Sequence, residues 1–237
     1  MPEEINRIVT DSIADLLWTP SPDGDQHLLN SGVNGDKIIR VGNIMIDTLS
    51  SMIQTVRKSD FLDGIQYVNK DHVVITLHRP SNVDDKDAFA GILSALEQIG
   101  TRIPLVFPLH PRTKNRAEQF GLADRLEAIP NIVLTGPAGY LDFVALMADA
   151  KLVLTDSGGL QEETTALGIP CLTLRENTER PITVTEGTNT IVGNDPQVIL
   201  NAVHNVLENG GKAGRIPDLW DGKTAARIAD IIEDTIR

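Results

Sequence analysis

The sequence predicts an α/β fold, a Rossmann-like doubly wound parallel sheet with helices on both of its faces. Apolar, β-branched segments of four to seven residues recur from residue 71 onward, and helical patterns separate each segment from the next. Polar or basic residues follow these strands, at the sheet edge where parallel α/β folds bind their ligands. With 41% hydrophobic residues, the 237-residue chain also has enough apolar material for a sizeable core.

The first 45 residues are predicted to be the remnant of an N-terminal Rossmann-like domain. Pro2 and the acidic residues after it are typical of the first turn of a helix. The segments after this helix are predicted as a strand at 14–18, a loop at 20–24, a helical turn at 26–30 and a strand at 37–42. Two strands and one helix cannot bury their own apolar faces, so residues 1–45 are interpreted as the tail end of a larger domain.

Residues 46–220 are predicted to form a Rossmann-like domain with a sheet of its own. After a helix at 47–57, strands are expected at 71–77, 103–109, 131–135, 151–155, 170–174 and 190–192. The helices expected between and after these strands span 86–99, 113–120, 123–129, 140–148, 160–167 and 196–208. A last helix at 223–237, within the final segment 221–237, follows a Gly- and Pro-rich stretch and stands apart from this alternation.

The strand predicted at 151–155 leads into a Gly-Gly turn and a helix. N–H groups at a helix start lack partners within the helix, and the helix dipole favours an anion there. Ser157, Gly158 and Gly159 are therefore interpreted as a phosphate-binding turn. Glu162 or Glu163, whose side chains point about 100° apart, would accept ribose hydroxyls. The alternative is a plain strand–helix turn with acidic residues favourably placed at the helix start.

Basic side chains follow other strands of the predicted sheet. His78 and Arg79 come after the first strand, His110 comes after the second, and Arg180 lies in the loop after the fifth. Guanidinium forks, imidazole rings and backbone N–H groups together suit a diphosphate. Taken singly, a histidine at a strand end is more often structural than functional, whereas the shared edge favours a nucleotide site.

Charge and cysteine content limit the possible partners and location. A net charge of −12 argues against nucleic acid and anionic membranes as partners. The single Cys171 excludes an internal disulfide, fits a reducing cytoplasm and is expected to be buried and inert within its apolar strand. No apolar run approaches the length of a membrane span, and the first residues show no signal-peptide pattern. A cytoplasmic location is therefore expected.

Eight motifs together resemble the non-hydrolysing UDP-N-acetylglucosamine 2-epimerase family in order and spacing. They are PEEINR at 2–7, VGN at 41–43, TLHRPSN at 76–82, FPLHPRT at 107–113, YLDFVALM at 140–147, DSGGLQEE at 156–163, ERP at 179–181 and EGTN at 186–189. The resemblance implies that the chain is the C-terminal half of a two-domain glycosyltransferase-B-type fold. It also implies that residues 221–237 form a helix that crosses back toward the first domain.

The resemblance implies an isomerase that converts UDP-GlcNAc to UDP-ManNAc. UDP would be eliminated and added back through 2-acetamidoglucal, without NAD or another cofactor and without a metal. This chemistry needs carboxylates near the sugar C2 atom and donor groups on the departing diphosphate. The expected ligands are UDP-GlcNAc and UDP, the expected assembly of the full-length form is a homodimer, and the expected context is cell-envelope polysaccharide biosynthesis.

The motifs also carry residue roles. Glu3 matches a catalytic carboxylate, and His78 matches a histidine that contacts the diphosphate and is needed for activity. The remaining matches are ligand contacts: Ser157, Gly158 and Gly159 for phosphate, Glu163 for ribose, Phe143 for uracil, and Arg180. Arg79 and His110 match positions that bind a second, regulatory UDP-GlcNAc in some bacterial members.

The chain departs from the family pattern in its first domain. That domain normally supplies a basic N-terminal segment, a mid-domain Asp and the Glu of a VEAGLR motif, none of which occurs here. Glu3 thus has no visible partner carboxylate, and we expect this chain to recognise UDP with little or no epimerase activity. The alternatives are a nucleotide-sugar binding module without catalysis and a hydrolysing epimerase that releases UDP and ManNAc. A glycosyltransferase is disfavoured by PEEINR and EGTN.

Overall fold

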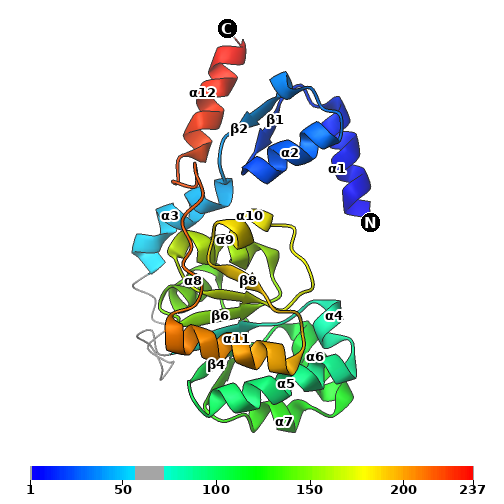
Figure 1. Ribbon diagram of the computed structural model, residues 1–237, viewed down its shortest axis with the longest axis vertical. Helices are drawn as coiled ribbons and strands as arrows, with labels where there is room; N and C mark the ends of the chain where they lie inside the picture. Colours follow the sequence, from blue (N-terminus) through cyan, green and yellow to red (C-terminus); the bar gives the residue numbers. More distant parts are fainter. Residues whose placement is uncertain (1, 57–71, 237) are drawn as a thin grey trace. The chain divides into compact units, whose positions relative to one another are not determined.

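Figure 1 shows the computed structural model of the chain, which describes residues 2–56 and 72–236. The chain divides into two compact units. The first unit contains residues 1–51 and 217–237, and the second contains residues 52–216. Of the two sheets formed by the described residues, the second unit holds the larger, and it also contains all predicted site residues except Glu3.

Within the described part of the chain, six parallel strands form the sheet of the second unit, in the order β5-β4-β3-β6-β7-β8. They are β3 (Val73–Thr76), β4 (Leu105–Pro108), β5 (Ile132–Thr135), β6 (Leu152–Thr155), β7 (Cys171–Thr173) and β8 (Asn189–Ile191). Counted from β3, this order is 3-2-1-4-5-6, the strand order of the Rossmann fold. The predicted doubly wound parallel sheet is confirmed.

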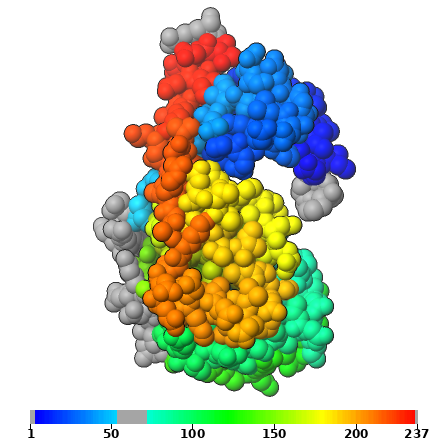
Figure 2. All heavy atoms as spheres, viewed as in Figure 1, coloured from blue at the N-terminus to red at the C-terminus, as the bar shows by residue number. Residues whose placement is uncertain are grey.

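Helices cover both faces of this sheet. They are α4 (Pro80–Val83), α5 (Lys86–Gly100), α6 (Pro111–Phe120), α7 (Ala123–Glu127), α8 (Tyr140–Ala148), α9 (Gly158–Leu167), α10 (Pro181–Thr185) and α11 (Pro196–Asn209). In the space-filling view the side chains of α11, coloured orange, hide the strands that the ribbon shows behind them (Figure 2). None of the helices in the described ranges combines the length and the apolar character needed to cross a lipid bilayer.

The alternation of side chains along β3 assigns the helices to their faces. Val73 and Ile75 belong to one buried apolar cluster together with residues of α5 and α11, which pack against each other. His72 belongs to the opposite face, where its Nε2 atom lies 3.0 Å from the carbonyl oxygen of Leu146 in α8. The buried Cys171 of β7 hydrogen-bonds to Thr164, which places α9 on this second face as well.

Four helix starts in the second unit differ from the prediction. Helix α6 begins at Pro111, two residues before the predicted start at Thr113. The helix predicted from Leu160 begins at Gly158, so both glycines of the turn lie in the first turn of α9. The short helices α4 and α10 were not predicted, although each begins with the signal of a proline at its first position. They begin directly after Arg79 and Arg180, and their fixed backbones therefore orient the chain at two predicted site residues.

The first unit contains a parallel strand pair, β1 (Leu17–Thr19) and β2 (Ile38–Arg40). Its helices are α1 (Pro2–Ile13), α2 (Pro22–Asn30), the 3-10 helix η1 (Gly35–Lys37), most of α3 (Ile44–Val56), and α12 (Thr224–Ile236). The strand predicted at 14–18 lies at 17–19 because α1 extends to Ile13. The loop predicted at 20–24 is wrong, since Pro22 begins α2 directly after Ser21.

Hydrogen bonds that α12 donates to earlier segments hold this helix within the first unit. Asp47 of α3 accepts hydrogen bonds from the backbone N–H groups of Thr224 (3.0 Å) and Ala225 (2.7 Å) at the start of the helix. Arg227 of α12 donates to the carbonyl oxygen of Val41, at 3.0 Å. These contacts join residues far apart in the sequence, while the interpretation of this unit as a domain remnant stays a prediction.

Gly100, the last residue of α5, allows a close approach to the chain that leads into β5. A Cβ atom at this position would lie 2.1 Å from the carbonyl oxygen of Pro130. We therefore expect Gly100→Ala to lower the free energy of unfolding of the second unit by roughly 1–3 kcal/mol, the usual cost of overpacking. Chemical denaturation measures this change. Gly136→Ala is the matched control, because a Cβ atom there would meet nothing within 4 Å. An equal loss in both variants would contradict this explanation.

Candidate functional site

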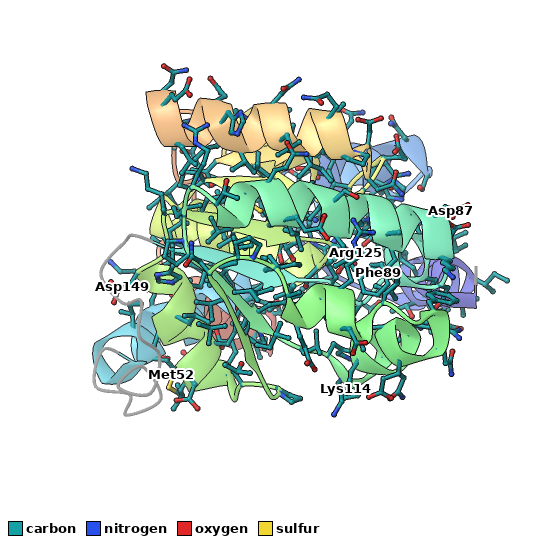
Figure 3. The ribbon with its side chains drawn as sticks, turned by 90° about the horizontal axis from the view of Figure 1, so that it is seen from below. Met52, Asp87, Phe89, Lys114, Arg125 and Asp149 are labelled. Carbon is teal, nitrogen blue, oxygen red and sulfur yellow. The ribbon has the colours of Figure 1, made fainter. Side chains whose placement is uncertain are left out.

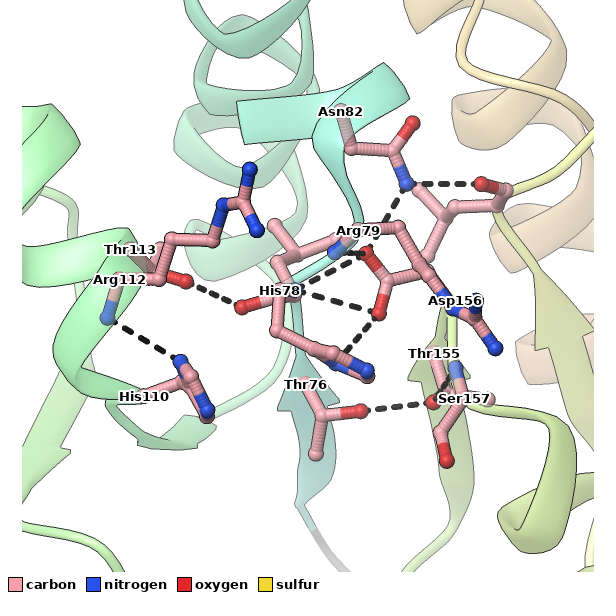
Figure 4. A network of polar contacts seen from close by, with 12 residues as sticks. Thr76, His78, Arg79, Asn82, His110, Arg112, Thr113, Thr155, Asp156 and Ser157 are labelled. Atoms are coloured by element: carbon pink, nitrogen blue, oxygen red, sulfur yellow. Dashed lines mark hydrogen bonds and ion pairs between the residues drawn. The ribbon is translucent and has the colours of Figure 1, made fainter. Parts of the chain in front are cut away.

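Several predicted site residues of the second unit directly follow β3 and β6. These neighbouring strands mark the point at which the chain reverses its direction of winding, toward β5 on one side and β8 on the other. Rossmann-like folds bind ligands outside the carboxyl ends of their strands at such a point. His78 and Arg79 follow β3, whereas Asp156 and Ser157 follow β6, and the four residues lie side by side (Figure 4).

Asp156, for which the sequence suggested no role, has no exposed surface. Its Oδ2 atom accepts hydrogen bonds from the backbone N–H groups of His78 (3.0 Å) and Arg79 (2.9 Å) and from the Asn82 side-chain amide (3.1 Å). Its Oδ1 atom lies 2.9 Å from His78 Nδ1. Burial alone would raise the pKa of Asp156, but the hydrogen bonds from His78 and Arg79 lower it below its usual value. An ionised carboxylate thus fixes residues 78–82.

The His78 and His110 rings face each other at this sheet edge. Their centroids lie 5.6 Å apart and their planes are tilted by 37°. His110 is also the N-cap residue of α6, and its Nδ1 atom accepts a hydrogen bond from the backbone N–H of Arg112 at 3.1 Å. Because each ring is tethered through Nδ1, each leaves Nε2 for a further contact. The side chain of His110 therefore has a structural part in addition to its predicted ligand role.

The start of α9 has the features of an anion site. Ser157, the residue before the helix, makes no side-chain hydrogen bond to the first turn. The N–H groups of this turn consequently lack the cap that a serine often supplies. A carboxylate oxygen of Glu179 lies 3.9 Å from the position that a Cβ atom on Gly158 would take. A negatively charged group therefore already lies close to the predicted phosphate-binding turn.

Three arginines lie near this carboxylate. Arg175 pairs with Glu179 directly (Nη2–Oε1, 2.9 Å), and Arg180 pairs with Glu162 (Nε–Oε1, 3.0 Å). The hydrogen bond from Arg175 lowers the pKa of Glu179, and the charges of Arg175, Arg79 and Arg180 lower it further. Three guanidinium groups thus lie near two carboxylates, and guanidinium forks match the oxygens of a diphosphate.

The adjacent glutamates of α9 are both buried, but they have different partners. Glu162 pairs with Arg180, whereas Glu163 accepts a hydrogen bond from the phenol of Tyr140 at the start of α8. Burial raises the pKa of Glu163, the charge of Glu162 adds to this effect, and the Tyr140 hydrogen bond opposes it. Burial and the neighbouring Glu163 raise the pKa of Tyr140 to about 12. A neutral phenol, and not a guanidinium, is therefore the hydrogen-bond partner of the predicted ribose acceptor.

Gln161 of α9 connects the glycine turn to two other motifs. The side chain is fully buried, and its Nε2 atom donates to the carbonyl oxygen of Ser157 at 3.1 Å. Its Oε1 atom accepts hydrogen bonds from Thr178 Oγ1 (2.5 Å) and Asn189 Nδ2 (3.0 Å). Asn189 in turn accepts from Thr173 Oγ1 at 2.7 Å. These bonds connect the glycine turn to the start of β8 and to residues 175–180, which form the arginine-bearing loop.

The two remaining predicted residues lie elsewhere in the chain. Phe143 is half-buried in α8, three residues after Tyr140. Glu3 belongs to the first turn of α1 in the first unit, and its side chain is outside what the structure describes. Within the described ranges, no group of His, Cys, Asp and Glu side chains could hold a metal ion.

Sequence reasoning missed the residues that arrange the site: Asn82, Tyr140, Asp156, Gln161 and Asn189. Each of them lies inside a motif quoted above, but no spacing rule assigns it a role. The available signal was weak. Asp156 directly follows a fully buried strand, where a polar residue must find partners if it stays buried.

A Rossmann-like sheet with an uncapped helix start and basic side chains at its switch point is typical of nucleotide-binding α/β proteins. The sequence profile of the UDP-N-acetylglucosamine 2-epimerase family matches residues 1–233, so the chain belongs to this family. The resemblance drawn from the motifs is thereby confirmed, as is the fold class of one half of a glycosyltransferase-B-like structure.

Individual relatives agree with this assignment. The chain is 38% identical over 238 residues to the UDP-N-acetylglucosamine 2-epimerase of Methanocaldococcus jannaschii, covering 98% of this chain and 64% of the relative. It is 37% identical to the UDP-2,3-diacetamido-2,3-dideoxy-D-glucuronate 2-epimerase of Pseudomonas aeruginosa, with 98% and 63% covered. A structure of the Methanocaldococcus jannaschii enzyme in complex with UDP-GlcNAc and UDP superimposes with a TM-score of 0.85 at 37% identity, covering 98% of this chain and 65% of that one. The chain thus spans less than two thirds of these relatives' length.

The raised pKa of Glu163 predicts a pH-dependent cost to stability. A carboxyl group whose pKa is higher in the folded chain than in the unfolded chain stabilises the fold fully below the unfolded pKa of 4.5. This stabilisation is lost as the pH rises through the folded pKa. Glu163→Gln keeps an acceptor for Tyr140 and removes the charge. We therefore expect this variant to unfold at a higher temperature than the wild type at neutral pH, with the difference shrinking toward pH 4.5. Calorimetry across the pH range measures this effect.

Glu97→Gln is the control of opposite sign. Arg125 of α7, labelled in Figure 3, pairs with Glu97 of α5 (Nε–Oε1, 2.7 Å), and this hydrogen bond lowers the pKa of Glu97. Its contribution to stability is present above 4.5 and is lost as the pH falls through the folded pKa. The Glu97 variant should therefore be the less stable protein at neutral pH and approach the wild type in acid. Shifts of the same sign in both variants would contradict these assignments.

Proposed function

We propose that the second unit is the UDP-binding half of a UDP-GlcNAc 2-epimerase. The observation that carries this proposal is the meeting of the uncapped α9 start with His78, Arg79 and Arg180 at the switch point of the sheet. An anion-binding helix start beside guanidinium and imidazole groups has the chemistry of a diphosphate site. The solved complex of the Methanocaldococcus jannaschii enzyme with UDP-GlcNAc and UDP supports the choice of nucleotide.

The proposed contacts follow the order of the nucleotide's parts. The diphosphate lies at Ser157, Gly158 and Gly159, with His78 and the arginines around it. The ribose hydroxyls replace the Tyr140 phenol as donors to Glu163, and the uracil lies on the side of Phe143. Arg79 and His110 contribute to the same basic edge, where they would also serve a second UDP-GlcNAc if this chain binds one.

The proposed reaction proceeds by elimination and re-addition. A base removes the proton from the sugar C2 atom, the bond between C1 and the UDP oxygen breaks, and 2-acetamidoglucal forms with free UDP. The UDP oxygen then attacks C1 while a proton is delivered to the opposite face of C2, which gives UDP-ManNAc. His78 and the guanidinium groups stabilise the negative charge that develops on the departing UDP. Glu3 of the first unit is the proposed carboxylate for proton transfer.

A second candidate for the 237-residue chain by itself is a nucleotide-sugar binding module. The observation that favours it is how much of the relatives the chain covers. The chain matches 64% of the Methanocaldococcus jannaschii protein, and the name of an epimerase belongs to that whole protein. We therefore propose that the isolated chain binds UDP and does not turn over UDP-GlcNAc.

Proton NMR of the purified chain with UDP-GlcNAc in D2O separates these functions. We expect the uridine signals to broaden on binding, while the signal of the sugar C2 proton persists over hours. Loss of the C2 proton signal or formation of UDP-ManNAc would show that the isolated chain is catalytic, and release of ManNAc would identify a hydrolysing epimerase. A parallel sample with UDP-2,3-diacetamido-2,3-dideoxy-D-glucuronate tests the sugar named for the Pseudomonas aeruginosa relative.

The proposed ribose contact predicts a loss of affinity. Glu163→Ala removes an acceptor for two hydroxyl groups, and we expect UDP binding to weaken by about 1.5–3 kcal/mol, or about 10- to 150-fold. Isothermal titration calorimetry measures this change. Glu118→Ala is the matched control, since Glu118 is an exposed glutamate near the far end of α6. Unchanged UDP affinity in the Glu163 variant would refute the assignment.

A further inference from the structure

The surroundings of Asp156 are more elaborate than a strand end requires. Hydrogen bonds from two backbone N–H groups, one side-chain amide and one imidazole reach this single carboxylate, which has no exposed surface. Burying a charge in this way is costly unless its oxygens are fully hydrogen-bonded. The donors all come from residues 78–82, the segment that follows β3. The carboxylate therefore acts on a single segment, and that segment begins with His78.

The two oxygens of Asp156 have different partners. Oδ2 accepts hydrogen bonds from the backbone N–H groups of His78 and Arg79 and from Asn82 Nδ2. Oδ1 lies 2.9 Å from His78 Nδ1 and accepts a longer hydrogen bond, of 3.2 Å, from the backbone N–H of His78. An ionised carboxylate oxygen only accepts hydrogen bonds, so Nδ1 of His78 must carry the hydrogen. Nε2 is then the ring atom available to a ligand. In the neutral ring it accepts a hydrogen bond, and in the charged ring it donates one.

We propose that Asp156 is a positioning residue that fixes the Nδ1–H tautomer and the ring orientation of His78, so that Nε2 faces the diphosphate and its leaving oxygen. The identity of the ligand rests on the proposed function, whereas the tautomer follows from the contact between Asp156 and His78 alone. Asn82 completes the arrangement, because its side-chain amide donates both to Asp156 and to the carbonyl oxygen of Leu174 (2.8 Å). These hydrogen bonds connect the segment that carries His78 to the residue after β6 and to the residue after β7.

Asp156→Asn gives a sharp test because the amide has only one accepting oxygen. Three donors converge on the Oδ2 position, so the amide oxygen of the variant should take that position. Its NH2 group then occupies the Oδ1 position and faces His78 Nδ1 as a donor. Nδ1 must become an acceptor, and the ring should change to the Nε2–H tautomer. A residue that only stabilised the fold would not produce this change.

The measurement is long-range proton–nitrogen NMR of the chain labelled with 15N-histidine, without ligand and at a pH where the ring is neutral. The chain has five histidines, and His78→Gln identifies the signal of His78 by its loss. We expect Nδ1–H in the wild type and Nε2–H in Asp156→Asn. The Nε2–H tautomer in the wild type, or the same tautomer in both proteins, would overturn the proposal. The wild-type result tests it even where the variant does not fold.

Thr113→Val is the control for general loosening. Thr113 is fully buried, and its hydroxyl group donates to the carbonyl oxygen of Leu77, the residue directly before His78. This variant loses a buried hydrogen bond beside His78 and should keep the Nδ1–H tautomer. A tautomer change in Thr113→Val would show that any disturbance of this segment is sufficient, and the specific role of Asp156 would be wrong.

UDP titrations connect the tautomer to ligand binding. His78→Gln and Asp156→Asn are each expected to weaken UDP binding by about tenfold, the effect of losing one hydrogen bond to a charged group. If Asp156 acts through His78, the double variant should be no weaker than His78→Gln alone, whereas independent roles would give about a hundredfold loss. Absence of UDP binding to the wild type would refute the proposed function and leave the tautomer result standing as a separate test.

Discussion

The buried charge of Asp156 is the constraint on which the arrangement of the site depends. The strands that carry it into place, β3 and β6, pair in register from Val73 and Leu152 to Thr76 and Thr155, and the last pair also shares a hydrogen bond between its hydroxyl groups at 2.6 Å. Asp156 is the residue directly after Thr155 of this pair. Because an ion without solvent must be surrounded by donors, the chain after β3 has to turn toward it, and this turn sets the direction of the His78 ring. Sheet register is in this way converted into side-chain orientation.

A second buried hydrogen-bond network, centred on Gln161, holds the glycine turn in place, as Asp156 holds His78. Gln161 holds the carbonyl oxygen of Ser157 from inside α9, and through Asn189 and Thr178 it ties the turn to β8 and the arginine-bearing loop. The side-chain polar atoms of Asp156 and Gln161 make hydrogen bonds within the chain. In the proposed site, these bonds restrict the groups that would contact a ligand, which lowers the cost of ordering them when a ligand binds.

The sequence was sufficient for the fold and for the sheet edge that carries the site. The strands of the second unit are apolar and β-branched, and their alternation with helices predicts the winding without reference to distant contacts. It was insufficient for Asp156, because the burial of that residue results from the pairing of β6 with a strand about eighty residues earlier in the chain. The same holds for Tyr140, whose phenol reaches Glu163 from another helix. The start of α9 was misplaced for a different reason, since two glycines suggest a turn and their helical conformation depends on the packing of the helix behind them.

In the proposed function, the division of the chain into two units separates nucleotide recognition from proton transfer. Every proposed nucleotide contact lies in the second unit, which has its own sheet and an extensive buried core. The first unit has a parallel strand pair, and α1 exposes Ile5, Ile8, Val9 and Ile13 along one face. Glu3 lies on this same helix. Proton transfer at C2 requires a carboxylate held within hydrogen-bonding reach of the sugar, and a helix whose apolar face is exposed is a poor support for such a carboxylate. Nucleotide binding should therefore be the property that the isolated chain retains, because its contacts depend on networks that are complete within one unit.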